Sequence, residues 1–354
     1  MKELSFNQGR LAFSLETFEM TPCLPDFVER RIRLFYLDEA GFRETSFTDF
    51  EDLKALWQEK PLVWLHLSGT LSEDFWKPLS KILDVGDEEI KYLRSPHRNS
   101  LFEDFPNSMF WTLHRPSVSE AFDAIETVNF LLTEKFLVTR QFSHDAAFTT
   151  VVHKLMSKGN KLQGFGVDCL AAELIGDIIG AYEEGLKMGG TKLEAIQNKI
   201  IRHPGKEELR LINRAQQVIW IILNTVWPIT TILQAILRSK NPALTENGKL
   251  DMQFRLQEAD SVVRLFETYR AMSYNLMDVY VSGIGLKTNE TTTVLTIIAT
   301  LFLPPTLIAG IYGMNFQIPE VHVQFGYYFC LAAMFAVSAG LLIWLKRKGF
   351  IDFL

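Results

Sequence analysis

Two long apolar segments without a charged residue lie near the C-terminal end of this 354-residue chain, joined by a short polar linker. They are Thr291–Tyr312 and Phe325–Leu345. Each has about the 20 residues that a helix needs to cross a hydrocarbon core of ~30 Å. The linker 313–324 is too short to be a domain. The pattern therefore predicts a hairpin of two transmembrane helices, 291–312 and 325–345, with 313–324 as its outer loop.

The residues before the hairpin predict an α+β domain followed by long helices. Apolar runs of the β type alternate with helical patterns, and two of the runs form a hairpin with its turn near Glu134 and Lys135. We expect a cytoplasmic α/β domain at 1–143 and long cytoplasmic helices at 144–249. The expected strands are 31–37, 62–67, 109–114, 127–133 and 136–140, and the expected helices are 49–59, 73–83, 165–203 and 207–239.

A further helical pattern starts near Leu250 and continues without a proline as far as Leu303. It predicts a stalk helix at 250–290 that is continuous with the first transmembrane helix. A helix from Leu250 to Tyr312 is about 95 Å long at 1.5 Å per residue. One small domain cannot pack against such a helix along its whole length, which favours packing against other copies of the chain.

Charge and cysteine content exclude some classes of protein, and the positions of the basic residues predict the orientation in the membrane. The net charge of −6 does not suit a protein that coats nucleic acid, and the three cysteines lack the spacing of a metal site or disulfide framework. Residues 1–10 are polar and lack the apolar part of a signal peptide. The basic tail 346–354 begins with Lys346, Arg347 and Lys348, whereas the outer loop has no Lys or Arg. We therefore expect a multi-pass protein of the inner or plasma membrane with both termini in the cytoplasm.

One face of the first apolar segment is smaller and more polar than the others. Its residues recur at intervals of three and four, which is a single helix face. A face of this kind fits close packing between helices, and it also fits the lining of a water-filled path. A path would need several copies around one axis, because two helices cannot enclose it. The face consists of Asn289, Thr292, Thr296, Ala299, Leu303, Thr306, Gly310 and Gly313.

The residues around the outer loop carry a resemblance to a known family. The stretches Thr288–Glu290, Val294–Thr300 and Leu307–Phe316 closely resemble the CorA family of divalent-cation channels, whose signature is Gly-Met-Asn. The resemblance implies a homopentamer in the membrane that conducts magnesium, cobalt or nickel inward, with no cofactor and no enzymatic activity. It also implies that Gly313, Met314 and Asn315 form the selectivity loop.

Other positions in this region follow the family or depart from it. Glu320 is retained, so a negative charge remains to attract cations from outside. Leu295 matches an apolar gate position of the pore, but Thr292 stands where the family has an apolar residue. The pore-lining residues implied in this way are Asn289, Thr292, Leu295, Thr296, Ala299, Leu303, Thr306 and Gly310.

Two other functions remain as alternatives. The related ZntB branch transports zinc, with proton coupling as a further alternative, but it usually carries Gly-Ile-Asn, so Met314 argues against it. A membrane-tethered sensor or enzyme is the other alternative. The scattered histidines form no metal-ligand spacing, and the chain has no phosphate-binding glycine loop and no nucleophile motif.

Family members also resemble one another in placing magnesium-sensing carboxylates between neighbouring subunits. Aligning this chain with them puts Tyr92 and Phe254 at the two expected acidic positions, and neither side chain binds a hard cation as a carboxylate does. We therefore expect sensing to be weakened or moved to acidic residues nearby. The candidates are Glu88, Glu89, Glu258 and Asp260.

Overall fold

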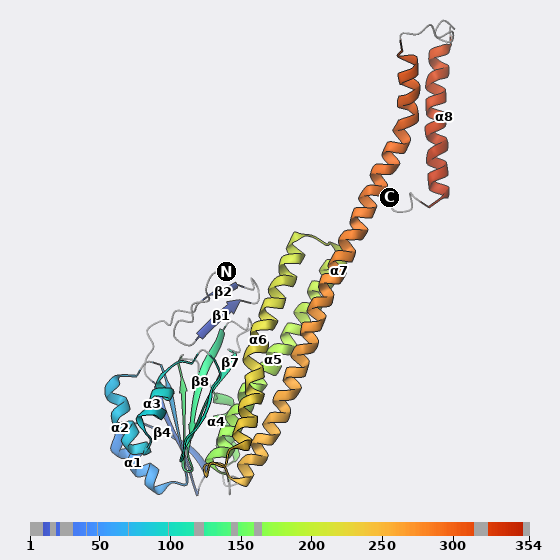
Figure 1. Ribbon diagram of the computed structural model, residues 1–354. Coiled ribbons are helices and arrows are strands. Elements are labelled where there is room, and N and C mark those ends of the chain that lie inside the picture. The colour runs from blue at the N-terminus through green and yellow to red at the C-terminus, as the bar shows by residue number, and fades with distance from the viewer. Residues whose placement is uncertain are drawn as a thin grey trace. The chain divides into compact units, whose positions relative to one another are not determined.

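The computed structural model in Figure 1 describes most of the chain, and the part it describes divides into two compact units. The first unit is Met1–Ile196 with Arg210–Asn275, and the second is Gln197–Leu209 with Leu276–Leu354. The described residues are 10–14, 19–21, 31–39, 41–47, 49–69, 71–97, 99–116, 124–142, 148–158, 165–314 and 325–349.

Within the described residues, nine strands of the first unit form one sheet. Its main path has the order β2-β1-β8-β9-β5-β3-β4, and β7 pairs with both β8 and β6. All pairs are antiparallel except β5 with β9, which lie parallel. The strands are β1 Arg10–Ser14, β2 Glu19–Thr21, β3 Arg31–Asp38, β4 Gly41–Ser46, β5 Leu62–Ser68, β6 Phe102–Asp104, β7 Met109–Pro116, β8 Ala124–Leu132 and β9 Phe136–Gln141.

Apolar cores form on both faces of this sheet. Successive residues of a strand point to opposite faces, and β5 follows this rule because Trp64 belongs to one core and Leu65 to the other. Both faces of β5 are buried, which is why it reads as a nearly continuous apolar run. Helices α1 Phe50–Glu59, α2 Glu73–Leu83 and α3 Asp87–Arg94 cover one face (Figure 1). Helix α4 Thr149–Lys158 and the long helices cover the other.

Local capping explains where the short and long helices begin. The carboxylate of Asp49 accepts a hydrogen bond of 2.9 Å from the backbone N–H of Asp52 and so caps the start of α1. Asp168, which is buried, accepts from both the backbone N–H and the hydroxyl of Thr245 at 2.7 and 2.6 Å. Thr245 directly precedes α7 Glu246–Tyr312, so Asp168 fixes the first turn of that helix.

The remaining helices are long, as the sequence predicts. Helix α5 is Val167–Arg202 and ends two residues before Pro204, and α6 Lys206–Arg238 continues through Pro228. Helix α7 has 67 residues without a break, so the expected stalk and first apolar segment are one helix. It begins four residues before the predicted start at Leu250. Helix α8 Gly326–Arg347 carries the second apolar segment.

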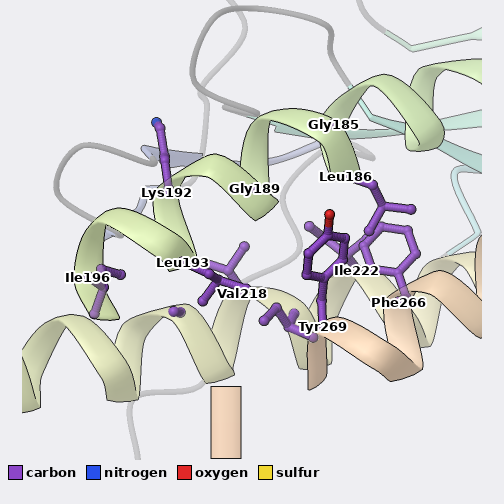
Figure 2. Close-up of a pocket in the computed structure, with 12 residues that line it drawn as sticks. Gly185, Leu186, Gly189, Lys192, Leu193, Ile196, Val218, Ile222, Phe266 and Tyr269 are labelled. Carbon is purple, nitrogen blue, oxygen red and sulfur yellow. The ribbon is translucent and has the colours of Figure 1, made fainter. Parts of the chain in front are cut away.

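A small apolar hollow of about 50 Å³ lies among α5, α6 and α7 in the first unit (Figure 2). Figure 2 shows the rings of Phe266 and Tyr269 reaching from α7 toward α5. Gly189 of α5 lines the hollow, and a Cβ placed there meets no atom within 4 Å. A Cβ on the next residue, Gly190, would clash with the Tyr269 hydroxyl oxygen.

These two adjacent glycines give a matched pair of stability tests. We expect Gly189→Ala to raise stability by up to ~1 kcal/mol, because alanine loses less entropy in a helix and has room here. We expect Gly190→Ala to lower stability by about 1–3 kcal/mol, because the Tyr269 ring must shift. Thermal unfolding of the full-length protein in detergent measures both. Equal shifts in the two variants would contradict this description of the helix packing.

Candidate functional site

The apolar parts of α7 and α8 leave most of their surface uncovered. Both helices are long and apolar enough to cross a membrane, and only 6% of the most apolar 18-residue stretch of each is buried. Helix α6 also meets these criteria of length and composition, but half of its most apolar stretch is buried. The apolar face of α6 thus packs within the protein, whereas α7 and α8 need an apolar environment outside it.

Helix α8 packs against one face of α7. On that face Ile297 is buried, Leu301 and Ile308 are half-buried, and the Ser338 hydroxyl donates to the carbonyl oxygen of Leu301 at 3.4 Å. Bulky residues on the flanks, such as Ile298 and Phe302, are exposed. The hairpin therefore buries a narrow apolar seam and leaves the rest of α7 open.

Two of the predicted pore-lining residues, Thr306 and Gly310, lie on the side of α7 that faces away from α8. Thr306 and Gly310 follow Ile297 and Leu301 by nine residues each, and nine residues at about 100° per residue amount to a half-turn. All eight residues are exposed: Asn289, Thr292, Leu295, Thr296, Ala299, Leu303, Thr306 and Gly310. One side of a single chain thus presents them together.

The threonines on this face have their hydroxyl protons engaged within the helix. Thr292, Thr296 and Thr306 donate to the carbonyl oxygens of the residues four positions earlier, at 2.9, 2.8 and 2.7 Å. Each hydroxyl oxygen keeps acceptor capacity directed away from its own backbone. Such a surface offers neutral oxygen acceptors to the water shell of a cation without a fixed charge.

The outer loop is described only at its start. Helix α7 ends at Tyr312, and the N–H groups of Gly313 and Met314 donate to the carbonyl oxygens of Ala309 and Ile311 at 2.9 and 3.2 Å. A Cβ on Gly313 would come within 3.2 Å of the Ala309 carbonyl oxygen, so a side chain there would crowd the turn. Met314 is exposed. Asn315 and Glu320 lie outside the described residues.

The predicted sensing carboxylates lie on two different elements. Glu88 and Glu89 are in the first turn of α3, whereas Glu258 and Asp260 are on α7. Glu258 accepts from Arg255 at 2.7 Å, so its charge is already partly compensated. Among the described residues, no three His, Cys, Asp or Glu side chains come close enough to hold one metal ion. Their sensing role stays a prediction. It is tested by measuring magnesium flux at different internal magnesium concentrations, in the wild type and in a variant in which all four carboxylates are neutralised.

The two residues at the expected acidic positions have other contacts. The Tyr92 hydroxyl donates to Glu103 at 3.4 Å, and that carboxylate raises the pKa of Tyr92. Phe254 is exposed on α7, and the guanidinium of Arg255 lies 5.2 Å from its ring centre. Neither side chain supplies a hard-cation ligand.

Sequence reasoning missed two features of this region. Exposed aromatic residues gather where α8 begins, namely Phe325, Tyr327, Tyr328 and Phe329. Aromatic residues of this kind sit at the headgroup level of membranes. Their clustering at one end of the second apolar segment is visible in the sequence and could have predicted this feature. The other missed feature is a charge network in which Glu173 of α5 lies 2.7 Å from Lys154 and 3.7 Å from Arg255.

Comparison with known proteins decides the family. Residues 59–347 match the family described as CorA-like Mg2+ transporter protein. The chain belongs to this family. Its relatives include magnesium and cobalt transport proteins, and its apolar C-terminal helices are compatible with membrane spans.

Individual CorA-like proteins match over most of their length. The cobalt/magnesium transport protein CorA of Thermotoga maritima is 25% identical over 310 residues, which is 87% of this chain and 88% of that protein. The complete structure of the CorA magnesium transporter from Methanocaldococcus jannaschii has a TM-score of 0.74 at 18% identity, covering 94% of this chain and 100% of that one.

The fold alone does not separate the branches of this family. The cytoplasmic domain of ZntB from Vibrio parahaemolyticus has a TM-score of 0.56 at 13% identity, covering 72% of this chain and 97% of that domain. The α/β domain and long helices of this chain are thus a CorA-like fold that the ZntB branch also has. The fold therefore does not identify the transported ion.

Proposed function

We propose that this chain is one subunit of a homopentameric channel that imports magnesium, with cobalt and nickel as further substrates. The observation that supports it most is that the eight predicted pore-lining residues are all exposed, with Thr306 and Gly310 a half-turn away from the residues under α8. A ring of subunits would turn this face toward one axis and leave α8 toward lipid. A detergent-solubilised mass of five times the 40.6 kDa chain is expected, and a monomer would remove the pore.

The selectivity of the channel follows from the chemistry of magnesium. This ion dehydrates reluctantly and usually keeps several waters. A ring of Asn315 amide oxygens at the outer mouth, with backbone carbonyls near Gly313, accepts hydrogen bonds from those waters. Neutral acceptors hold the hydrated ion weakly enough to release it. Glu320 adds a negative charge that concentrates cations near the mouth.

The direction of transport follows from orientation and membrane potential. Lys346, Arg347 and Lys348 at the end of α8 support an orientation in an inner or plasma membrane with both termini in the cytoplasm. An inside-negative potential then drives entry, with about 4.6 kcal/mol per 100 mV for a double charge. Transport needs neither a cofactor nor a catalytic step.

Uptake into sealed proteoliposomes tests this function against its alternatives. We expect magnesium to enter, cobalt and nickel to compete with it, and a pH gradient to have no effect. Zinc uptake that requires a pH gradient would favour the ZntB-like alternative. Correctly inserted protein that moves no divalent ion would favour a membrane-tethered sensor.

A further inference from the structure

Arg140 is a buried arginine at the end of β9, on the face of the sheet that α1, α2 and α3 cover. It is 7% exposed. Its guanidinium carbon lies 4.6 Å from the ring centre of Trp76 and 4.6 Å from that of Phe142. The two rings pack against the guanidinium. The N–H donors lie on the edge of the guanidinium and need other groups as hydrogen-bond acceptors.

Two of those donor atoms lack partners. Among the residues that the structure describes, the buried Nε and Nη1 atoms of Arg140 have no hydrogen-bond acceptor. Burial lowers the pKa of Arg140 to about 10, which leaves the side chain charged at neutral pH. A buried charge without a partner is costly, and a buried polar group without one points to an ion or water. By contrast, Arg33 lies 4.8 Å from the Phe35 ring and donates to both carboxylate oxygens of Glu44.

A second arginine lies near Arg140. The Arg94 guanidinium lowers the pKa of Arg140 further and lies 5.9 Å from the Trp76 ring, while its own partner is Glu73. Arg140 pairs with Leu67 in register, at the C-terminal end of the parallel strands β5 and β9. Helix α2 begins five residues after β5 ends, so its N-terminal end, whose first turn also carries Glu73 and Asp74, lies close to Trp76. Edges of parallel strands with a following helix are common anion sites.

We propose that Arg140 is the centre of a binding site for a small inorganic anion, with Arg94 as a second positive group. The N–H groups on the edge of the Arg140 guanidinium donate to the anion, and the rings of Trp76 and Phe142 shield the pair from water. The enclosed position favours a small inorganic ion over an organic one. The site is separate from the proposed cation path and does not depend on it.

Anion-dependent stability tests this site in the full-length protein. Thermal unfolding is measured without divalent cations in sodium phosphate, sodium bromide and sodium gluconate at constant ionic strength and pH. We expect phosphate or bromide, but not the bulky gluconate, to raise the wild-type midpoint by about 5 °C at 100 times the dissociation constant. The better of the two anions tells an oxyanion site from a halide site.

Two variants separate specific binding from a general salt effect. Arg140→Gln is expected to lose the anion-dependent rise, whereas Arg33→Gln, which removes a stacked but paired arginine, is expected to keep it. Equal rises in all three proteins, or no rise in the wild type, would overturn the site.

A second measurement does not depend on the folding of the Arg140 variant. Trp76 is 3% exposed, so bromide in bulk solvent cannot collide with it, whereas bromide bound at Arg140 would quench its fluorescence. Subtracting the fluorescence of the Trp76→Phe variant from that of the wild type isolates the fluorescence of Trp76. Saturable quenching of the Trp76 fluorescence by bromide supports the site. If bromide raises the midpoint of thermal unfolding but does not quench Trp76, the proposed site is wrong.

Discussion

Asn315→Ala is expected to lower magnesium flux by about 100-fold or more, to the level of empty vesicles, while the oligomer stays assembled. In the proposed filter each subunit contributes one amide oxygen, so a single substitution removes the whole ring of acceptors at once. The hydrated ion then has no partner at the mouth that compensates for leaving bulk water. Flux of magnesium into proteoliposomes measures the effect.

Gln317→Ala is the matched control for this prediction. It removes an amide of the same chemistry two residues away in the same loop, outside the Gly-Met-Asn motif. We expect it to change flux by less than about threefold. Near-normal flux through the Asn315 variant, or equal losses in both variants, would contradict the assignment of ion recognition to Asn315.

Cysteines on the predicted pore face are expected to make the channel sensitive to charged, water-soluble thiol reagents. Modification at Thr296, Thr306 or Gly310 should block most of the flux, because the added charged group stands in a narrow water-filled path in all subunits. The native Cys330 on α8 is half-buried and is first replaced by alanine. Flux before and after treatment measures the block.

The control positions follow from the structure of the hairpin. Ile297 is buried under α8. Ile298 is exposed in the single chain but lies two residues from Thr296, about 160° around the helix. Cysteines at both should leave flux unchanged, since one is covered and the other faces lipid. Equal protection at all five positions would favour the alternative in which the small-residue face only packs against another helix.

Patterns along the chain predicted the main elements well where the signal is local. The bounds of α2 and the start of β5 match the predicted segments, and α1 begins one residue after its predicted start. Breakers such as Pro204 with Gly205 ended the long helices where expected. These features depend on residues within one or two turns, which the sequence displays directly.

The features that depend on distant residues were not predictable in the same way. The short strands β2 and β6 have three residues each, too few for a periodic pattern. The parallel pairing of β5 with β9 joins segments about 70 residues apart, and it is this pairing that brings Arg140 beside Trp76. Likewise, the sequence does not show which face of α7 packs against α8. The half-turn between that face and Thr306 or Gly310 can be seen only in the packed hairpin.

The most direct test of the transport mechanism is magnesium uptake under an imposed membrane potential. Proteoliposomes with a potassium diffusion potential, and with no ATP or pH gradient, report initial rate and final accumulation. The proposed channel predicts faster entry when the inside is negative, and an equilibrium accumulation of roughly 2,000-fold for a doubly charged ion at 100 mV. Uptake that ignores the potential and follows an imposed proton gradient would contradict it.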